Sequence, residues 1–259
     1  MNISPLTLGT AQLTQPYGIS NSNKDYNKDS AFILLDNAIE NGLTTWDTSP
    51  EYGNSERIIG QYLNINKSSV TICTKLPSII KKYGYKVEKN KIYDIVTNNI
   101  ELSLKSLNRY VIDCYLIHDE RDFITYGEIL IDALNENINK EKILTIGISV
   151  YTPKIADAAL KEKEISLIQL PMNIFDHRFK NCVQRSIDYN VKILVRSIYL
   201  QGLFFTSLDI CKKRIPQAYD PLKKLFQISR DYNLSIPEIA LGYIKSIDGV
   251  SSVVIGMKT

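Results

Sequence analysis

The feature that most constrains the fold is a regular alternation of short apolar runs with stretches of helical periodicity. Each apolar run has the length of a β-strand, and most of the intervals between runs carry apolar residues at helical spacing. The eight runs are residues 6–9, 43–47, 70–75, 112–117, 144–149, 165–170, 191–197 and 253–256. Eight such units within about 250 residues predict an α/β chain folded as a (β/α)8 TIM barrel. No break in composition divides the chain, so we expect one domain over residues 1–259.

The intervals between the runs predict where the helices lie. Helical patterns cover residues 29–41, 55–63, 91–107, 129–138, 153–163, 181–189, 221–232 and 236–247. Ser235 and Glu238 have the spacing of a capping box at the start of the last pattern. Residues 83–89 and 199–216 show no clear period, and we expect loops there. The chain ends three residues after the eighth run, so we expect a barrel that lacks its final helix.

An open, doubly wound sheet is the competing architecture. Such folds bind dinucleotides through a G-x-G-x-x-G turn after the first strand. The first run ends at Gly9, and Thr10-Ala11-Gln12 follows it without that motif. We therefore favour the barrel.

Charge and cysteine content exclude several classes of function. The chain has 31 basic and 28 acidic residues, a net charge of +3, so nothing favours nucleic acid or a membrane surface as a partner. The four cysteines lack the spacing of a zinc site, and no metal is expected. There is no run of 18 apolar residues and no leader-like N-terminus, so a cytoplasmic location is the default expectation.

Polar side chains close six of the predicted strands. In a barrel the catalytic groups gather at the carboxyl ends of the strands. These ends carry Asp47, Lys75, His118, Ser149, Gln169 and Arg196, and Tyr52 follows Asp47 by five residues. Taken singly, each has a plainer interpretation, such as a turn cap, a surface lysine or a hydrogen-bonded rim histidine. Together they predict a site.

The residue types favour proton transfer from a phenol. A free tyrosine has a pKa near ~10, and a nearby ammonium stabilises the phenolate and lowers that pKa. Lys75 would be this ammonium, Asp47 would hold it in place, and His118 would orient a carbonyl oxygen toward Tyr52. Such a site protonates oxygen while a hydride adds to carbon, so the chemistry requires a donor such as a reduced nicotinamide.

The order of these residues closely resembles the aldo-keto reductases. The resemblance rests on Asp47-Thr48-x-x-x-Tyr52-Gly53, Lys75 in TKL and His118 in LIHD, and it covers nearly the whole chain. It implies a barrel that reduces aldehydes or ketones with NADPH, less often NADH. Tyr52 would be the general acid, Lys75 its partner, Asp47 the ion-pair partner of the lysine and His118 the carbonyl-orienting group. The segments around residues 17–21 and 196–202 also resemble bacterial members associated with carbohydrate metabolism.

The resemblance carries over to the cofactor residues less completely. It places Ser149 and Gln169 on the nicotinamide carboxamide, although Val150 stands where the family has Asn. It places Arg196 where many members stack an aromatic ring on the nicotinamide, from which position the arginine could also reach phosphate or substrate. Ser197, Gln201 and Lys258 complete the expected cofactor residues.

Two other functions remain open at this point. The first is a non-catalytic, cofactor-sensing barrel, which would keep Asp47, Tyr52, Lys75 and His118 but convert no substrate. The short segment after the last apolar run favours it. A barrel with Lys75 as a Schiff-base lysine would perform aldol or dehydratase chemistry. The sequence identifies neither the carbonyl substrate nor the oligomeric state.

Overall fold

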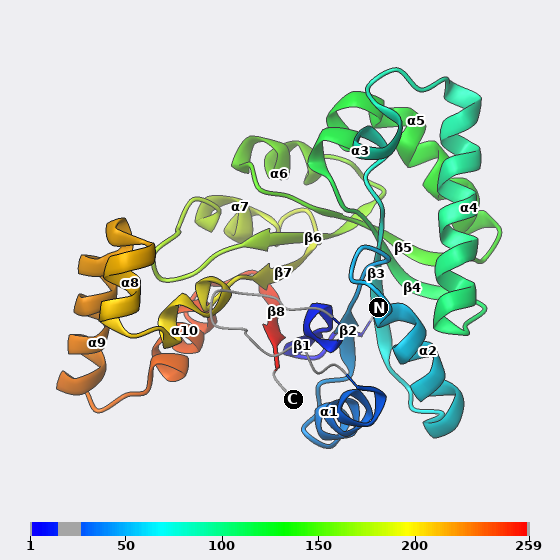
Figure 1. The fold of residues 1–259 in the computed structure, drawn as a ribbon. Helices are drawn as coiled ribbons and strands as arrows, with labels where there is room; N and C mark the ends of the chain where they lie inside the picture. The colour runs from blue at the N-terminus through cyan, green and yellow to red at the C-terminus, as the bar shows by residue number, and fades with distance from the viewer. Residues whose placement is uncertain (1, 15–26, 258–259) are drawn as a thin grey trace.

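The chain folds into a closed parallel barrel of eight strands in the order β1 to β8 (Figure 1). The structure is a computed structural model, and it describes residues 2–14 and 27–257. The strands are β1 Leu6–Gly9, β2 Thr45–Asp47, β3 Thr71–Leu76, β4 Ile112–Ile117, β5 Ile143–Ser149, β6 Ile165–Pro171, β7 Lys192–Arg196 and β8 Val250–Gly256. All eight predicted runs are strands, and β1 pairs with β8 to close the barrel. The predicted (β/α)8 fold is confirmed.

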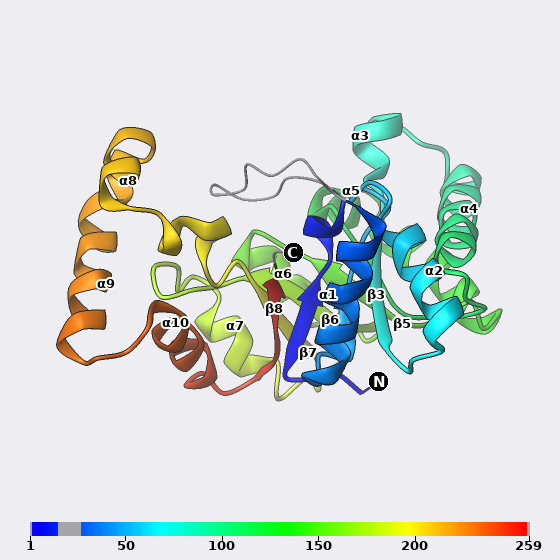
Figure 2. The ribbon, with the colours of Figure 1, turned by 60° about the horizontal axis from the view of Figure 1, so that its bottom comes forward.

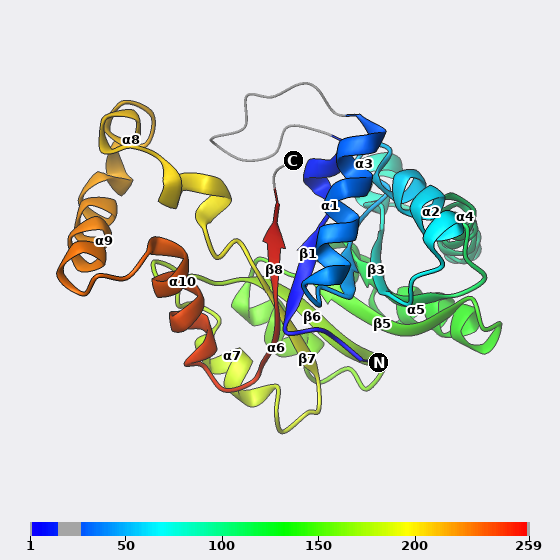
Figure 3. The same cartoon turned by 90° about the horizontal axis from the view of Figure 1, so that it is seen from below.

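Helices cover the outside of this barrel (Figures 1–3). The α-helices are α1 Lys28–Glu40, α2 Ser55–Asn66, α3 Ile79–Tyr83, α4 Lys89–Leu107, α5 Glu120–Asn139, α6 Pro153–Ala159, α7 Lys180–Arg185, α8 Leu208–Arg214, α9 Tyr219–Asp231 and α10 Ile236–Lys245. Short 3-10 turns are η1 Ala11–Leu13, η2 Leu200–Phe205 and η3 Pro216–Ala218. None of the described helices is long and apolar enough to cross a membrane.

Several predicted boundaries were wrong. The predicted loop 199–216 contains η2 and α8, and the short helix α3 precedes the predicted loop 83–89. Helices α6 and α7 end at Ala159 and Arg185, earlier than expected. Short helices such as α3 and α8 escape periodicity because they complete too few turns to repeat an apolar face. The capping box at Ser235 and Glu238 is confirmed.

The segment between β7 and β8 builds a core of its own. Leu203 and Phe204 of η2 pack with Leu222 and Leu225 of α9 and with Ala240 of α10. In all three ribbon views α8 and α9 lie at the outer edge of the molecule, beyond α10 (Figures 1–3). This arrangement anchors the pocket-lining residues of η2 on a packed support rather than on a free loop.

Alternation along the strands decides which side chains enter the barrel. Successive residues of a strand point to opposite faces. Cys73 of β3 and Leu116 of β4 pack with Leu167 of β6 and Leu194 of β7 in a separate interior cluster. Trp46 of β2, in contrast, packs outward among the barrel-and-helix core. Interior and exterior therefore alternate as a barrel requires.

Helix α2 approaches α4 closely at Gly60. A Cβ added there would lie 2.3 Å from the Ser106 carbonyl oxygen and 2.7 Å from the Leu107 carbonyl carbon. We expect Gly60→Ala to destabilise the protein by about 1–3 kcal/mol, because the overpacked backbone cannot give way cheaply. Urea denaturation followed by circular dichroism would measure this loss.

Gly242 of α10 provides the matched control. A Cβ there would meet no heavy atom within 4 Å. Gly242→Ala should stabilise the fold by about 0.5–1 kcal/mol, through helix propensity alone. Equal gains from both substitutions would contradict the close approach of α2 and α4.

Candidate active site

Strand alternation brings the predicted polar residues to the mouth of the barrel. Cys73 lies inside the barrel, so Lys75, two residues on, lies inside as well. Leu167 is an interior residue of β6, and Gln169 follows it by two positions. Leu194 is an interior residue of β7, and Arg196 follows it by two positions. The same spacing that fills the barrel with apolar side chains therefore directs these polar ones into its open end.

Lys75 is the centre of the site. Its side chain is fully buried, and Nζ donates hydrogen bonds of 2.8 Å to Oδ1 of Asp47 and 2.8 Å to the carbonyl oxygen of Thr48. Nζ also lies 4.7 Å from the centroid of the Tyr52 ring. Burial alone would lower the pKa of Lys75, but the Asp47 carboxylate and the Tyr52 phenol outweigh burial and raise it. The lysine is thus held as an ammonium against Tyr52.

Asp47 receives a second hydrogen bond from the far side of the barrel. Gln169 Nε2 donates to Asp47 Oδ1 at 2.7 Å, and the Gln169 side chain is almost fully buried. The family resemblance implies that Gln169 binds the nicotinamide carboxamide. Here its amide nitrogen is engaged by the carboxylate that pairs with Lys75, so Gln169 helps to fix the orientation of Asp47.

A hydroxyl network holds the turn that carries Tyr52. The Ser55 hydroxyl donates to the Thr10 hydroxyl at 2.8 Å, and Thr10 donates to the Asp47 carbonyl oxygen at 2.9 Å. The Thr14 hydroxyl donates to the Tyr52 carbonyl oxygen at 2.6 Å. These bonds tie the ends of β1 and β2 to the start of α2, which sets the position of the Tyr52 ring.

His118 lies beside Tyr52 and is held by Glu51. The two rings meet edge to face with centroids 6.1 Å apart, and His118 Nδ1 is 2.8 Å from Glu51 Oε2. The hydrogen bond with His118 lowers the pKa of Glu51, and the positive charge of Lys81 acts in the same direction. With Nδ1 engaged by the carboxylate, Nε2 is the ring nitrogen left for a ligand.

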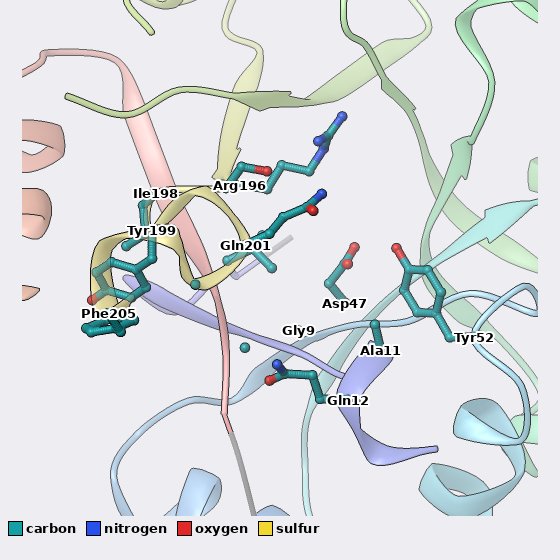
Figure 4. Close-up of a pocket in the computed structure, with 14 residues that line it drawn as sticks. Gly9, Ala11, Gln12, Asp47, Tyr52, Arg196, Ile198, Tyr199, Gln201 and Phe205 are labelled. Atoms are coloured by element: carbon teal, nitrogen blue, oxygen red, sulfur yellow. The ribbon is translucent and has the colours of Figure 1, made fainter. Parts of the chain in front are cut away.

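A cavity of about 330 Å3 opens over these residues. Asp47 and Tyr52 lie on one side of it, and Arg196, Gln201 and Phe205 lie on the other (Figure 4). Gly9, Ala11, Gln12, Ser197, Ile198, Tyr199, Gly202, Val254 and Gly256 complete the lining. Lys75 and Gln169 are buried and hydrogen-bond to Asp47, and neither they nor His118 are among the lining residues.

Of the remaining predicted residues, some line this cavity and others do not. Ser149 is buried at the end of β5, where it pairs in register with Gln169. Ser197 and Gln201 line the cavity on a turn with left-handed backbone at both positions. Lys258 lies outside the described residues, as do residues 17–21. No group of acidic, histidine and cysteine residues suited to a metal ion occurs in the described part of the chain.

Sequence reasoning missed three contributors to the site. Glu51 directly precedes Tyr52 but gave no signal, because its contact with His118 joins residues 67 positions apart in sequence. Tyr151, just after β5, packs its ring against the Arg196 guanidinium. Thr10 directly follows β1, and its hydroxyl bonds to the end of β2. A search for polar or aromatic residues within two positions of each strand end would have found all but Glu51.

The Glu51 contact predicts a dependence of stability on pH. Because the folded-state pKa of Glu51 is lowered from 4.5, its contribution is present above that value and is lost as pH falls below it. Glu51→Gln should therefore lower the melting temperature at neutral pH, and the difference from wild type should shrink below about pH 4. Thermal unfolding of both proteins across this range measures the effect.

A double-mutant cycle isolates the pair. Its arms are Glu51→Gln, His118→Asn and the double variant. Coupling that is present at neutral pH and vanishes in acid is expected. Additive losses at every pH would contradict a functional contact between the two side chains.

Comparisons with known proteins show which family the chain is related to. The model of the aldo/keto reductase family matches residues 5–259. An uncharacterised oxidoreductase of Bacillus subtilis, YqkF, is 24% identical over 269 residues, which cover 96% of this chain and 85% of the relative. The D-arabinose 1-dehydrogenase of Saccharomyces cerevisiae is 31% identical over 162 residues, 58% of this chain and 44% of the relative. The matched region spans about half the length, or less, of three further curated relatives.

Solved structures show the same fold. The glycerol dehydrogenase of Gluconobacter oxydans superposes with a TM-score of 0.74 at 20% identity, over 99% of this chain and 83% of that one. The family model covers almost the whole chain, and the barrel is the one found in such a structural neighbour. The protein therefore belongs to the aldo/keto reductase family of oxidoreductases.

Proposed function

We propose that this protein reduces an aldehyde or ketone with NADPH or NADH, and that Tyr52 is the general acid. The observation that carries the proposal is the buried ammonium of Lys75, which pairs with Asp47 and also lies 4.7 Å from the centroid of the Tyr52 ring. An ammonium at this position stabilises a phenolate, so it makes the phenol a better proton donor.

The residues present fit a nicotinamide dinucleotide. The cavity is lined by a guanidinium, a serine hydroxyl and a glutamine amide, from Arg196, Ser197 and Gln201, beside the glycine ends of β1 and β8. A Cβ at Gly256 would come within 2.8 Å of Gln12 Oε1, so a larger residue there would displace the Gln12 side chain, which also lines the cavity. Ser197, Gln201 and the glycine wall would hold the cofactor, which would supply a hydride to the carbonyl carbon when bound.

The side chains of the site would supply the proton and stabilise the group that loses it. The Tyr52 hydroxyl donates its proton to the carbonyl oxygen, so the carbonyl becomes an alcohol and Tyr52 becomes a phenolate. Lys75 stabilises that phenolate, and Asp47 keeps Lys75 charged and in place. His118, held at Nδ1 by Glu51, offers its other nitrogen to the carbonyl oxygen. A proton from water restores the Tyr52 phenol.

The same geometry disfavours the Schiff-base alternative. Imine formation requires a neutral amine as nucleophile. Asp47 and Tyr52 raise the pKa of Lys75, and Asp47 and the Thr48 carbonyl oxygen both accept hydrogen bonds from its amine. A lysine held in this way is a positioned charge rather than a nucleophile.

Oxidation of NADPH and NADH in the presence of carbonyl compounds tests the proposal. The panel should include aryl aldehydes, aldoses, ketoses and keto-sugars, because the resemblance to carbohydrate-associated members and the D-arabinose 1-dehydrogenase relative both favour sugars. We expect consumption of reduced cofactor that depends on the carbonyl compound and yields the corresponding alcohol. A protein that binds cofactor but reduces nothing in the panel would favour the cofactor-sensing alternative.

A further inference from the structure

The guanidinium of Arg196 lines the cavity without a carboxylate partner. In residues 2–14 and 27–257 no ion pair of Arg196 is found, whereas Arg121, Arg178 and Arg185 each pair with an aspartate. The only hydrogen bond it donates among these residues is a long one, 3.4 Å from Nη2 to the Val150 carbonyl oxygen. Most of its five N–H donors therefore remain for a ligand.

Strand order shows how far this side chain reaches. Arg196 ends β7, and Val150 and Tyr151 follow β5, so the side chain spans β6, which lies between them in the barrel. Arg196 pairs in register with Pro171 at the end of β6. The guanidinium thus lies over the end of β6, at the mouth of the barrel. Figure 4 shows it on the cavity wall together with Gln201 (Figure 4).

Tyr151 forms a platform for this guanidinium. The Arg196 Cζ atom lies 4.1 Å from the centroid of the Tyr151 ring, the shortest such cation–ring distance among the described residues. Glu120 fixes the backbone that carries this ring, because its Oε2 accepts hydrogen bonds from the backbone N–H groups of Tyr151 at 2.7 Å and Thr152 at 3.0 Å. A guanidinium stacked in this way is pre-organised and loses little entropy when it binds a ligand.

The charge balance around the cavity favours an anion. Asp47 is the one carboxylate on the described lining, and it is already neutralised by the Lys75 ammonium. Arg196 adds a further positive charge, and no carboxylate in the described part of the chain pairs with it. A planar guanidinium recognises carboxylate and phosphate oxygens through paired N–H donors.

We propose that Arg196, stacked on Tyr151, recognises an oxyanion group of the substrate, so that the protein prefers carbonyl compounds that carry a carboxylate or a phosphate. The inference rests on the proposed reductase function and names the substrate class for that site. Arg196 would bind the anionic end while Tyr52, on the opposite side of the cavity, meets the carbonyl oxygen.

Matched pairs of aldehydes test the proposal with the full-length protein. The first pair is para-carboxybenzaldehyde and its neutral methyl ester, and the second is glyceraldehyde phosphate and glyceraldehyde. Wild type should have a lower KM for the anionic member of at least one pair. Arg196→Met should raise that KM by about 10- to 100-fold, the loss expected for a charge-assisted hydrogen-bonding pair, and leave the neutral member nearly unchanged.

Two further variants separate charge from geometry. Arg196→Lys keeps the charge but loses the planar fork, so it should recover only part of the preference. Arg185→Met is the matched control, because Arg185 also lies over a tyrosine ring, Tyr189 at 5.9 Å, but pairs with Asp157 on α6, outside the cavity. We expect Arg185→Met to change neither KM.

Binding measurements make the result independent of turnover. Without cofactor, para-carboxybenzaldehyde should raise the melting temperature of wild type but not of Arg196→Met, and the methyl ester should raise neither. If no aldehyde were reduced, the proposed reductase function would be wrong. The shift in melting temperature would still show that Arg196 binds an anion. Preference for the carboxylate pair or for the phosphate pair identifies which oxyanion the site accepts.

Three results would overturn the inference. Equal KM values for anionic and neutral members in wild type would remove the preference itself. An equal rise in both KM values in Arg196→Met would make the arginine a general structural residue. A loss of NADPH affinity in Arg196→Met, measured by nicotinamide fluorescence, with unchanged discrimination between aldehydes would assign the guanidinium to a cofactor phosphate instead.

Discussion

Replacing Tyr52 by Phe will lower the rate of carbonyl reduction by about 10²- to 10⁴-fold, the usual contribution of a positioned general acid. The substitution removes only the hydroxyl. A phenyl ring can still face the Lys75 ammonium, now 4.7 Å from the ring centroid, and the edge of the His118 ring. The loss can therefore be assigned to the missing proton rather than to a collapsed site.

The measurement pairs turnover with cofactor binding. Reduction of the best substrate of the panel should fall in kcat, while nicotinamide fluorescence should give an unchanged Kd for the cofactor. Tyr110→Phe serves as the control, because that side chain is almost fully exposed and remote from the cavity lining. A Tyr52→Phe protein with the wild-type rate would show that another group supplies the proton.

Replacing Lys75 by Met will destabilise the fold by about 3–5 kcal/mol, because it leaves the buried Asp47 carboxylate without its ammonium. Asp47 is 4% exposed and Lys75 is fully buried, so little of the carboxylate surface is left for water to solvate when the ammonium is lost. For a chain of this size the loss corresponds to a fall in melting temperature on the order of 10 °C. Scanning calorimetry or thermal circular dichroism will measure it.

Two further variants are compared with Lys75→Met for their effect on stability. Adding Asp47→Asn to Lys75→Met should restore much of the stability, because the amide removes the unpaired charge and can still accept the hydrogen bond from Gln169. Lys142→Met removes a surface ion pair with Glu101, which water screens, and should cost far less stability than Lys75→Met. Equal losses in Lys75→Met and Lys142→Met would contradict a buried pair.

The pH dependence of the Lys75 contribution follows from its raised pKa. The folded-state pKa lies above the ordinary value of 10.5, so the stabilisation is fully present below about pH 10.5 and is lost as pH rises through the folded value. The difference in stability between wild type and Lys75→Met should therefore stay constant across neutral pH. This separates it from the Glu51 effect, which fades in acid.

The sequence by itself determined the barrel and the identity of the central residues. Strand alternation and helical spacing are local patterns, so all eight strands were found from runs of a few residues each. Asp47, Tyr52, Lys75 and His118 could be singled out because each lies at or just after a predicted strand end. Their catalytic roles remain predictions that the variants above will test.

Only the tertiary structure decided which side chains meet. Gln169 reaches Asp47 across 122 residues of sequence, and Arg196 crosses β6 to stack on Tyr151. Such contacts depend on the closure of the barrel and on which face of each strand turns inward, and neither is encoded in the spacing of neighbouring residues. The sequence thus located the polar strand ends, and the closed barrel placed them as a buried ion pair on one side of a cavity and, on the other, an arginine without an ion pair among the described residues.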